Sequence, residues 1–171
     1  MTILNYLVTI CIAVLLLAAI CRDVATRTIP DIISILIVLL GLAARTQAGM
    51  HAMVVSMAIS VALFGLLAQT HRWGMIGGGD VKLISALSCG LSPVSVWHFV
   101  LTTALAGGVL ACLYLLLGAL MRGTSGFKPA APGVCGLHRV FAIEWWRIAH
   151  RRSLPYGVAI GFGGITTLIF S

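Results

Sequence analysis

The stretch GGGDVKL, residues 77–83, places three glycines and an aspartate at the start of an apolar run. The chain has only four acidic residues among 171, so the position of Asp80 needs a physical reason. An ionised carboxylate in lipid costs at least about 2.5 kcal/mol, so such a residue is either shielded at an interface or retained for chemistry. Asp80 is therefore the first candidate functional residue.

The composition is that of a polytopic membrane protein. Hydrophobic residues make up 60% of the chain, charged residues make up 9%, and the mean hydropathy is +1.11. A single soluble domain of this length needs far less apolar material for its core. With a rise of about 1.5 Å per residue, most of the apolar stretches can cross a hydrocarbon layer of about 30 Å. We predict an all-α bundle of about six transmembrane helices that forms one integral-membrane domain, residues 1–171. The predicted spans are residues 3–21, 30–48, 50–69, 76–92, 94–121 and 155–170.

The basic residues predict the orientation in the membrane. Ten of the eleven lie after the first span, around the start of the fourth span, or in the segment 122–154, and only Arg45 falls on the opposite side. The positive-inside rule then places these three regions in the cytoplasm and both termini outside, as expected for a protein of the cytoplasmic (inner) membrane. The formal net charge of +7 is explained in this way without a nucleic-acid partner.

Two of the acidic residues are predicted to meet on the cytoplasmic side. Asp23 closes the first span and Asp80 opens the fourth, and the chain between them crosses the membrane twice and so returns to the same face. A helix from Asp80 to residue 91 would be only about 18 Å long. We therefore expect the preceding glycines to enter the membrane as non-helical backbone beside a wet pocket. Asp31, directly after Pro30, suits the first turn of a helix and is interpreted as structural.

The segment HRVFAIEWWRIAHRR, residues 138–152, has an amphipathic pattern. On a helix, Phe141 and Trp145 project from one face, and Glu144 and Arg147 project from the other. The pattern predicts an interfacial helix on the anionic cytoplasmic leaflet. Interruptions of the apolar face leave a partner-binding surface as the alternative.

Two motifs resemble those of a known family. RDVATRTIPD, residues 22–31, has an aspartate a few residues before Ile-Pro, and GGGDVKL has the form G-x-G-D-x-K-L. With the LPYGVAIG opening of the last span, residues 154–161, they resemble the motifs of type IV prepilin peptidases, which are intramembrane aspartic proteases of the G-x-G-D class. The resemblance covers essentially the whole chain. It is to the short form found with Tad or Flp pili and to the similar archaeal preflagellin peptidases, because nothing matches the C-x-x-C domain of the larger methylating members.

The resemblance implies a function and a set of site residues. The substrate would be a type IV prepilin or pseudopilin precursor, whose short basic leader is removed at a glycine on the cytoplasmic face. Asp23 and Asp80 would be the catalytic pair, without metal or cofactor, and no methyltransferase activity is expected. Glycines before Asp80 would let an extended substrate strand pass the aspartates, and a nearby lysine would either reach the interface or tune the charge of the site. These site-shaping residues are Gly77, Gly78, Gly79 and Lys82.

Aspartic proteolysis needs two carboxyls that share one proton, so that one activates water while the other protonates the carbonyl oxygen. Asp23 is expected to hold the proton, because it lies near the negative C-terminal end of a helix, whereas Asp80 lies at an N-terminal end that favours the charged form. The neighbouring Arg22 and Arg27 act in the opposite direction on Asp23.

Other functions remain open from the sequence. Presenilin-like and signal-peptide-peptidase-like proteases share G-x-G-D, but they typically carry Tyr-Asp at the first motif, where this chain has Arg22 before Asp23. A non-enzymatic proton or cation carrier would also use acids in the membrane, and acids that lie far apart near mid-membrane would favour it. The five histidines have no metal-site spacing and the five cysteines form no C-x-x-C pair, so neither a metalloprotease nor a disulfide framework is predicted.

Overall fold

The computed structural model describes residues 3–120 and 154–170, and over these ranges the chain is all-α with no strand. The predicted loop 122–154 and its interfacial helix 138–152 lie outside the described residues, apart from Leu154. The helices are α1 (Ile3–Thr26), α2 (Asp31–Thr46), α3 (Met50–Arg72), α4 (Gly78–Gly90), α5 (Pro93–Leu120) and α7 (Tyr156–Phe170).

The six predicted spans correspond to six helices, but the helices differ in length. Only α1, α3 and α5 are both long enough and apolar enough to cross a membrane, and α7 is a shorter apolar helix of 15 residues. α2 has 16 residues and α4 has 13, so α4 measures about 20 Å. Over the described residues the structure thus confirms the all-α class with three candidate membrane spans, and it does not confirm six complete crossings.

Two helix boundaries differ from the prediction in ways that matter for the acids. α1 continues to Thr26, five residues beyond its predicted end, so Asp23 lies within its last turn. α4 begins at Gly78, with Gly77 as an extended N-cap. The expectation that all three glycines are non-helical is therefore wrong for Gly78 and Gly79. A helix that starts two residues earlier leaves Asp80 at its third position, where an acid suits the helix N-terminus.

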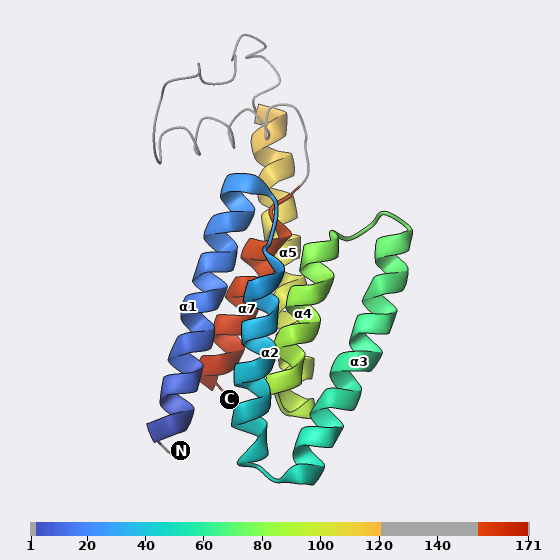
Figure 1. Cartoon of the computed structure of the whole chain (residues 1–171). Helices are drawn as coiled ribbons and strands as arrows, with labels where there is room; N and C mark the ends of the chain where they lie inside the picture. Colours follow the sequence, from blue (N-terminus) through green and yellow to red (C-terminus); the bar gives the residue numbers. More distant parts are fainter. Residues whose placement is uncertain (1–2, 121–153, 171) are drawn as a thin grey trace.

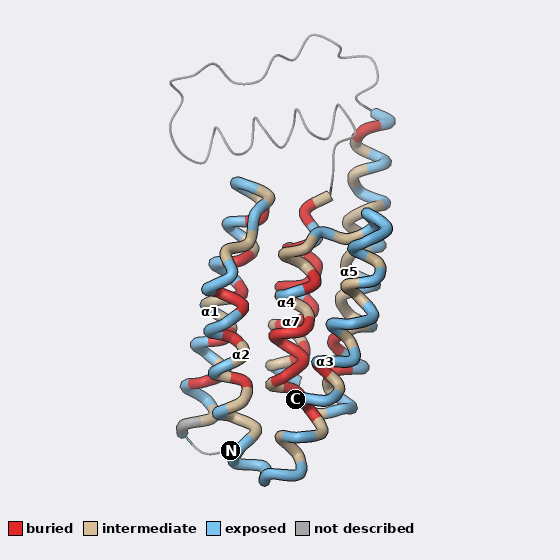
Figure 2. The backbone as a smooth tube through the Cα atoms, turned by 45° about the vertical axis from the view of Figure 1, so that its right-hand side comes forward, coloured by how far each residue is buried: buried red, intermediate tan, exposed pale blue. Residues whose placement is uncertain are grey.

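Successive helices run in opposite directions, so the end of α1 and the starts of α4 and α7 lie at one end of the bundle, which we call the site end (Figure 1). Both termini of the chain lie at the other end (Figure 1). α4 packs against α2, α3 and α7, and α7 packs also against α1 and α5. Figure 2 shows that buried backbone is concentrated on α4 and α7, in the middle of the bundle.

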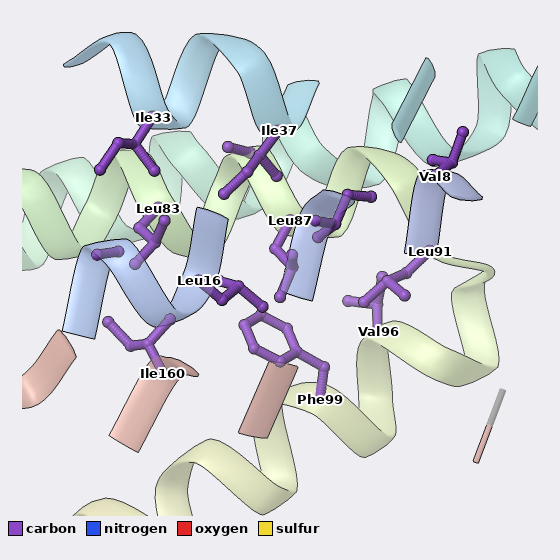
Figure 3. Close-up of a cluster of buried hydrophobic side chains, with 13 residues drawn as sticks. Val8, Leu16, Ile33, Ile37, Leu83, Leu87, Leu91, Val96, Phe99 and Ile160 are labelled. Carbon is purple, nitrogen blue, oxygen red and sulfur yellow. The ribbon is translucent and has the colours of Figure 1, made fainter. Parts of the chain in front are cut away.

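The core is formed by aliphatic side chains around one phenylalanine. Figure 3 shows Leu16, Leu87 and Phe99 close together, with Ile37, Leu83 and Ile160 nearby. None of the six is more than 2% exposed, and together they come from every described helix except α3. The only buried residues of α3 are Ser56 and Ser60. α3 therefore contributes no large apolar side chain to the buried core.

Close backbone contacts at glycines hold the short helices in place. A Cβ added at Gly41 of α2 would lie 2.8 Å from the Cα of Gly90 in α4, so neither residue tolerates a side chain without a shift of backbone. Gly161 and Gly164 of α7 likewise face Ile20 and Leu16 of α1. Small residues at helix contacts permit close packing, which is a main source of stability where the surroundings are lipid.

Gly41→Leu tests this packing. The new side chain would press on the α4 backbone, and overpacking of this kind typically costs about 1–3 kcal/mol. We expect a lower midpoint of thermal unfolding in detergent for Gly41→Leu. Gly65→Leu is the matched control, because a Cβ at Gly65 of α3 meets nothing within 4 Å. Equal unfolding midpoints for the two variants would contradict the role of the Gly41–Gly90 contact.

Candidate active site

Asp23 is a buried acid held by a helix that is distant in the sequence. Its side chain is on the last turn of α1 and is 6% exposed. Its Oδ2 accepts a hydrogen bond of 2.9 Å from the backbone N–H of Gly157, in the first turn of α7. The N-terminus of a helix carries a partial positive charge and free N–H groups, so α7 stabilises negative charge on this carboxyl.

Only glycine fits at position 157. A Cβ added there would lie 2.7 Å from Oδ2 of Asp23 and 2.8 Å from its Cβ and Cγ. The absence of a side chain therefore allows the N-terminus of α7 to approach the carboxyl directly. The N–H of Gly157 offsets part of the cost of burying Asp23, because a buried charge is less unfavourable when it accepts hydrogen bonds.

Asp80 lies in the first turn of α4, and its carboxyl turns back toward the start of its own helix. It receives a hydrogen bond from the Gly77 backbone, which is the geometry of an acid at N3 that caps the N-cap residue. A Cβ at Gly77 would lie 2.8 Å from Oδ2 of Asp80. Gly77 thus leaves room for the carboxyl at the helix N-terminus.

Asp23 and Asp80 line the same cavity, of about 230 Å³, at the site end of the bundle. They are close enough for Asp23 to act electrostatically on Asp80, and Arg27 acts on Asp80 as well. The cavity is also lined by residues of the α1–α2 connection, among them Arg27 and Ile29. Arg27 has a φ of 57°, a left-handed conformation that is uncommon outside glycine. It terminates α1 and turns the chain around the cavity.

The predicted glycines form one wall of this cavity. Gly77, Gly78 and Gly79 all line it together with Asp80. A Cβ on Gly79 would lie 3.3 Å from the Cβ of Ile29, and one on Gly78 would lie 3.4 Å from the ring of His71. These contacts show that the glycines permit close packing of α4 against the α1–α2 connection and the end of α3.

Lys82 does not contact the catalytic candidates. Its Nζ is 2.8 Å and 2.9 Å from the two carboxylate oxygens of Asp31, and both side chains are well exposed, at 48% and 65%. The pair joins α4 to the start of α2. An exposed ion pair contributes at most about 1 kcal/mol. Lys82 therefore neutralises the third carboxyl near the site instead of binding Asp80.

Sequence reasoning did not assign roles to Gly157, Ile29 or His71. His71 closes the α3–α4 loop through a 2.7 Å hydrogen bond between its Nδ1 and the carbonyl oxygen of Ile76. The available signal for Gly157 was the Pro-Tyr-Gly opening of the last span, residues 155–157, which marks a helix start. That signal predicts where the helix begins. It does not predict that Gly157 contacts Asp23, which lies 134 residues away in the sequence.

The site contains no evident metal-binding chemistry. Among residues 3–120 and 154–170, no group of three or more His, Cys, Asp or Glu side chains could hold a metal ion. Cys11, Cys21, Cys89 and Cys112 are free thiols, and Cys135 lies outside these ranges. The chemistry that the described arrangement can perform is proton transfer between two carboxyls and a water molecule.

Comparison with known proteins identifies the family of the chain. The family model described as the type IV leader peptidase family matches residues 10–112, which include both Asp23 and Asp80. No curated protein and no solved structure matches the chain. Because the matched residues are more than half of the chain, the protein belongs to the type IV leader peptidase family.

Proposed function

We propose that this protein is an intramembrane aspartic endopeptidase that removes the short basic leader from a type IV prepilin or pseudopilin. The observation that carries the proposal is that Asp23 and Asp80, from two separate helices, line one small cavity. The cleavage would take place at the cytoplasmic face of the inner membrane. Arg22, Arg27 and Arg72 lie at the site end and Arg45 lies at the other end, which supports this orientation.

The proposed reaction uses water and one shared proton. One carboxylate removes a proton from water, and the resulting hydroxide attacks the carbonyl carbon of the scissile peptide. The other carboxyl donates its proton to the carbonyl oxygen, and the tetrahedral intermediate then collapses with protonation of the leaving amine. Each turnover restores a pair that holds a single proton, so neither a metal ion nor an organic cofactor enters the scheme.

The geometry favours Asp23 as the base and Asp80 as the acid. The N–H of Gly157 donates to Asp23 across a helix–helix contact, so the positive N-terminal end of α7 opposes the effect of the negative C-terminal end of α1 on this carboxyl. Asp80 also borders a larger apolar space, between α3, α5 and α7, that disfavours a second negative charge. We therefore reverse the assignment of the proton that was predicted from the sequence.

A proton or cation carrier receives less support. A carrier requires acids that exchange ions with both faces of the membrane in turn. Here the two acids adjoin each other at one end of the bundle, and Asp31, the third described acid, is paired with Lys82 at the same end. Three acids at one end of the bundle suit a site that binds a polar substrate from that end only.

The first test replaces the catalytic pair. Asp23→Asn and Asp80→Asn each keep the side-chain size but remove the carboxyl, and we expect each to lower processing at least about 10²-fold. The measurement is co-expression with an epitope-tagged type IV prepilin whose leader removal shifts its mobility on a gel. Asp31→Asn is the matched control, because this acid lines the same cavity but pairs with Lys82, and it should retain most activity. Normal processing by either member of the pair would refute the mechanism.

The second test concerns Gly157. Gly157→Ala places a methyl group against the Asp23 carboxyl, so we expect kcat to fall about tenfold or more, with a smaller change in KM. Gly161→Ala is the control: it faces the same helix α1 but crowds only the end of the Ile20 side chain. Similar kcat values for the two alanine variants would show that contact between α1 and α7, and not the donor to Asp23, is what matters.

The third test locates the proton. Infrared spectroscopy at the pH of maximal activity should detect a protonated carboxyl stretch that is absent in Asp80→Asn. The band should persist in Asp31→Asn, because Asp31 pairs with Lys82 and is not a member of the proposed catalytic pair. A band that is lost in Asp23→Asn and kept in Asp80→Asn would place the proton on Asp23 instead.

A further inference from the structure

Asp80 lies at a junction between two different spaces. On one side is the polar cavity that it shares with Asp23. On the other side is a larger groove of about 500 Å³, bounded by the second half of α3 and by α5 and α7. Asp80 is the only Asp, Glu, Lys, Arg or His that lines this groove among the described residues, and the rest of the lining is mainly aliphatic or small.

The groove exists because α3 is attached to the bundle through its first half. Ser56 donates to the carbonyl oxygen of Leu91 at 2.8 Å, and Ser60 donates to that of Ser85 at 2.6 Å. No residue of α3 after Ser60 is buried, and α3 has few contacts with α5. Figure 1 shows α3 diverging from α4 toward the site end. Leu63 and Leu67 therefore face an apolar space that no described helix fills.

The α5 wall of the groove begins with Phe99, Val100 and Thr103 and continues with four small residues. Ala104, Gly107, Gly108 and Ala111 all line it, at spacings that place them along one side of the helix. A Cβ at Gly108 would meet nothing within 4 Å, so the space beside it is open. This small-residue stretch allows another helix to approach closely, which is how helices associate where the surroundings are lipid.

We propose that this groove, which shares Asp80 as a lining residue with the catalytic cavity, holds the hydrophobic helix that follows the scissile bond of the substrate. The inference rests on the proposed function, which supplies a substrate with a polar leader on one side of the cut and an apolar helix on the other. The site has the same division. The polar cavity accommodates the polar leader, and the mainly apolar groove accepts the apolar segment without burying a further charge. The peptide bond between the two segments then lies beside Asp80.

Gly108→Leu tests the proposal by filling the groove. We expect KM for a tagged type IV prepilin to rise about tenfold with a smaller change in kcat, because a binding contact is lost while the carboxyls remain in place. Gly65→Leu is the matched control and should leave both constants unchanged, since Gly65 is also a helical glycine with open space around it but does not line the groove. Unfolding midpoints of the two variants serve to exclude a general loss of stability.

Photocrosslinking gives a readout that does not depend on turnover. A benzophenone amino acid at Leu67, which lines the groove, should capture the uncleaved prepilin in an Asp80→Asn background. The same probe at Leu66, 65% exposed and outside the groove, should capture little. Equal capture at both positions, or a KM for Gly108→Leu equal to that of the wild type, would overturn the groove assignment alone. A wild-type protein that leaves the prepilin uncut would overturn the proposed function together with it.

Discussion

The contact between the Gly157 N–H and the Asp23 carboxyl is the interaction on which the site depends. It joins the last turn of α1 to the first turn of α7, which are 134 residues apart. The contact is possible only because Gly157 has no side chain, and Gly161 and Gly164 continue the same close packing along α7. A carboxyl that is 6% exposed is thereby given a hydrogen-bond donor and the positive end of a helix. Without them the burial of Asp23 would be strongly unfavourable.

The second constraint is the shortness of α4. With 13 residues it is the most deeply packed helix of the bundle, and it is surrounded by α2, α3 and α7. Its N-terminus therefore lies at the site end, where Asp80 and Asp23 line one cavity of about 230 Å³. The residues before Gly78 are largely exposed, with Trp73 and Met75 each 67% exposed, so the non-helical backbone lies at the edge of the bundle.

Burial and charge divide the site end into two chemical environments that meet at Asp80. The cavity contains carboxyls and an arginine, and the groove between α3, α5 and α7 contains aliphatic and small residues. A membrane protease that cuts between a charged leader and an apolar helix needs both environments next to its catalytic pair. The second half of α3, which has no buried residue, thus borders the groove that the proposed function uses.

From the sequence alone, the helical class, the approximate positions of the helices and the two candidate acids could be predicted. Apolar run length and the position of Pro30, Pro93 and Pro155 are local signals, and the agreement of α2 and α5 with their predicted ranges reflects this. The number of predicted crossings between Asp23 and Asp80 also places the two acids at the same end. Two crossings return the chain to the face that it left, so this prediction requires no knowledge of which helices are in contact.

Only the tertiary structure decided how each acid is held. The Asp31–Lys82 pair, the donor from Gly157 and the packing of Gly79 on Ile29 all join residues that are far apart in the chain. A hydrophobic pattern reports which residues leave water, but it does not report which helix each one faces. The number of complete membrane crossings was likewise not settled by apolar runs, because a run such as 76–92 can end as a short helix that is buried by protein and not by lipid.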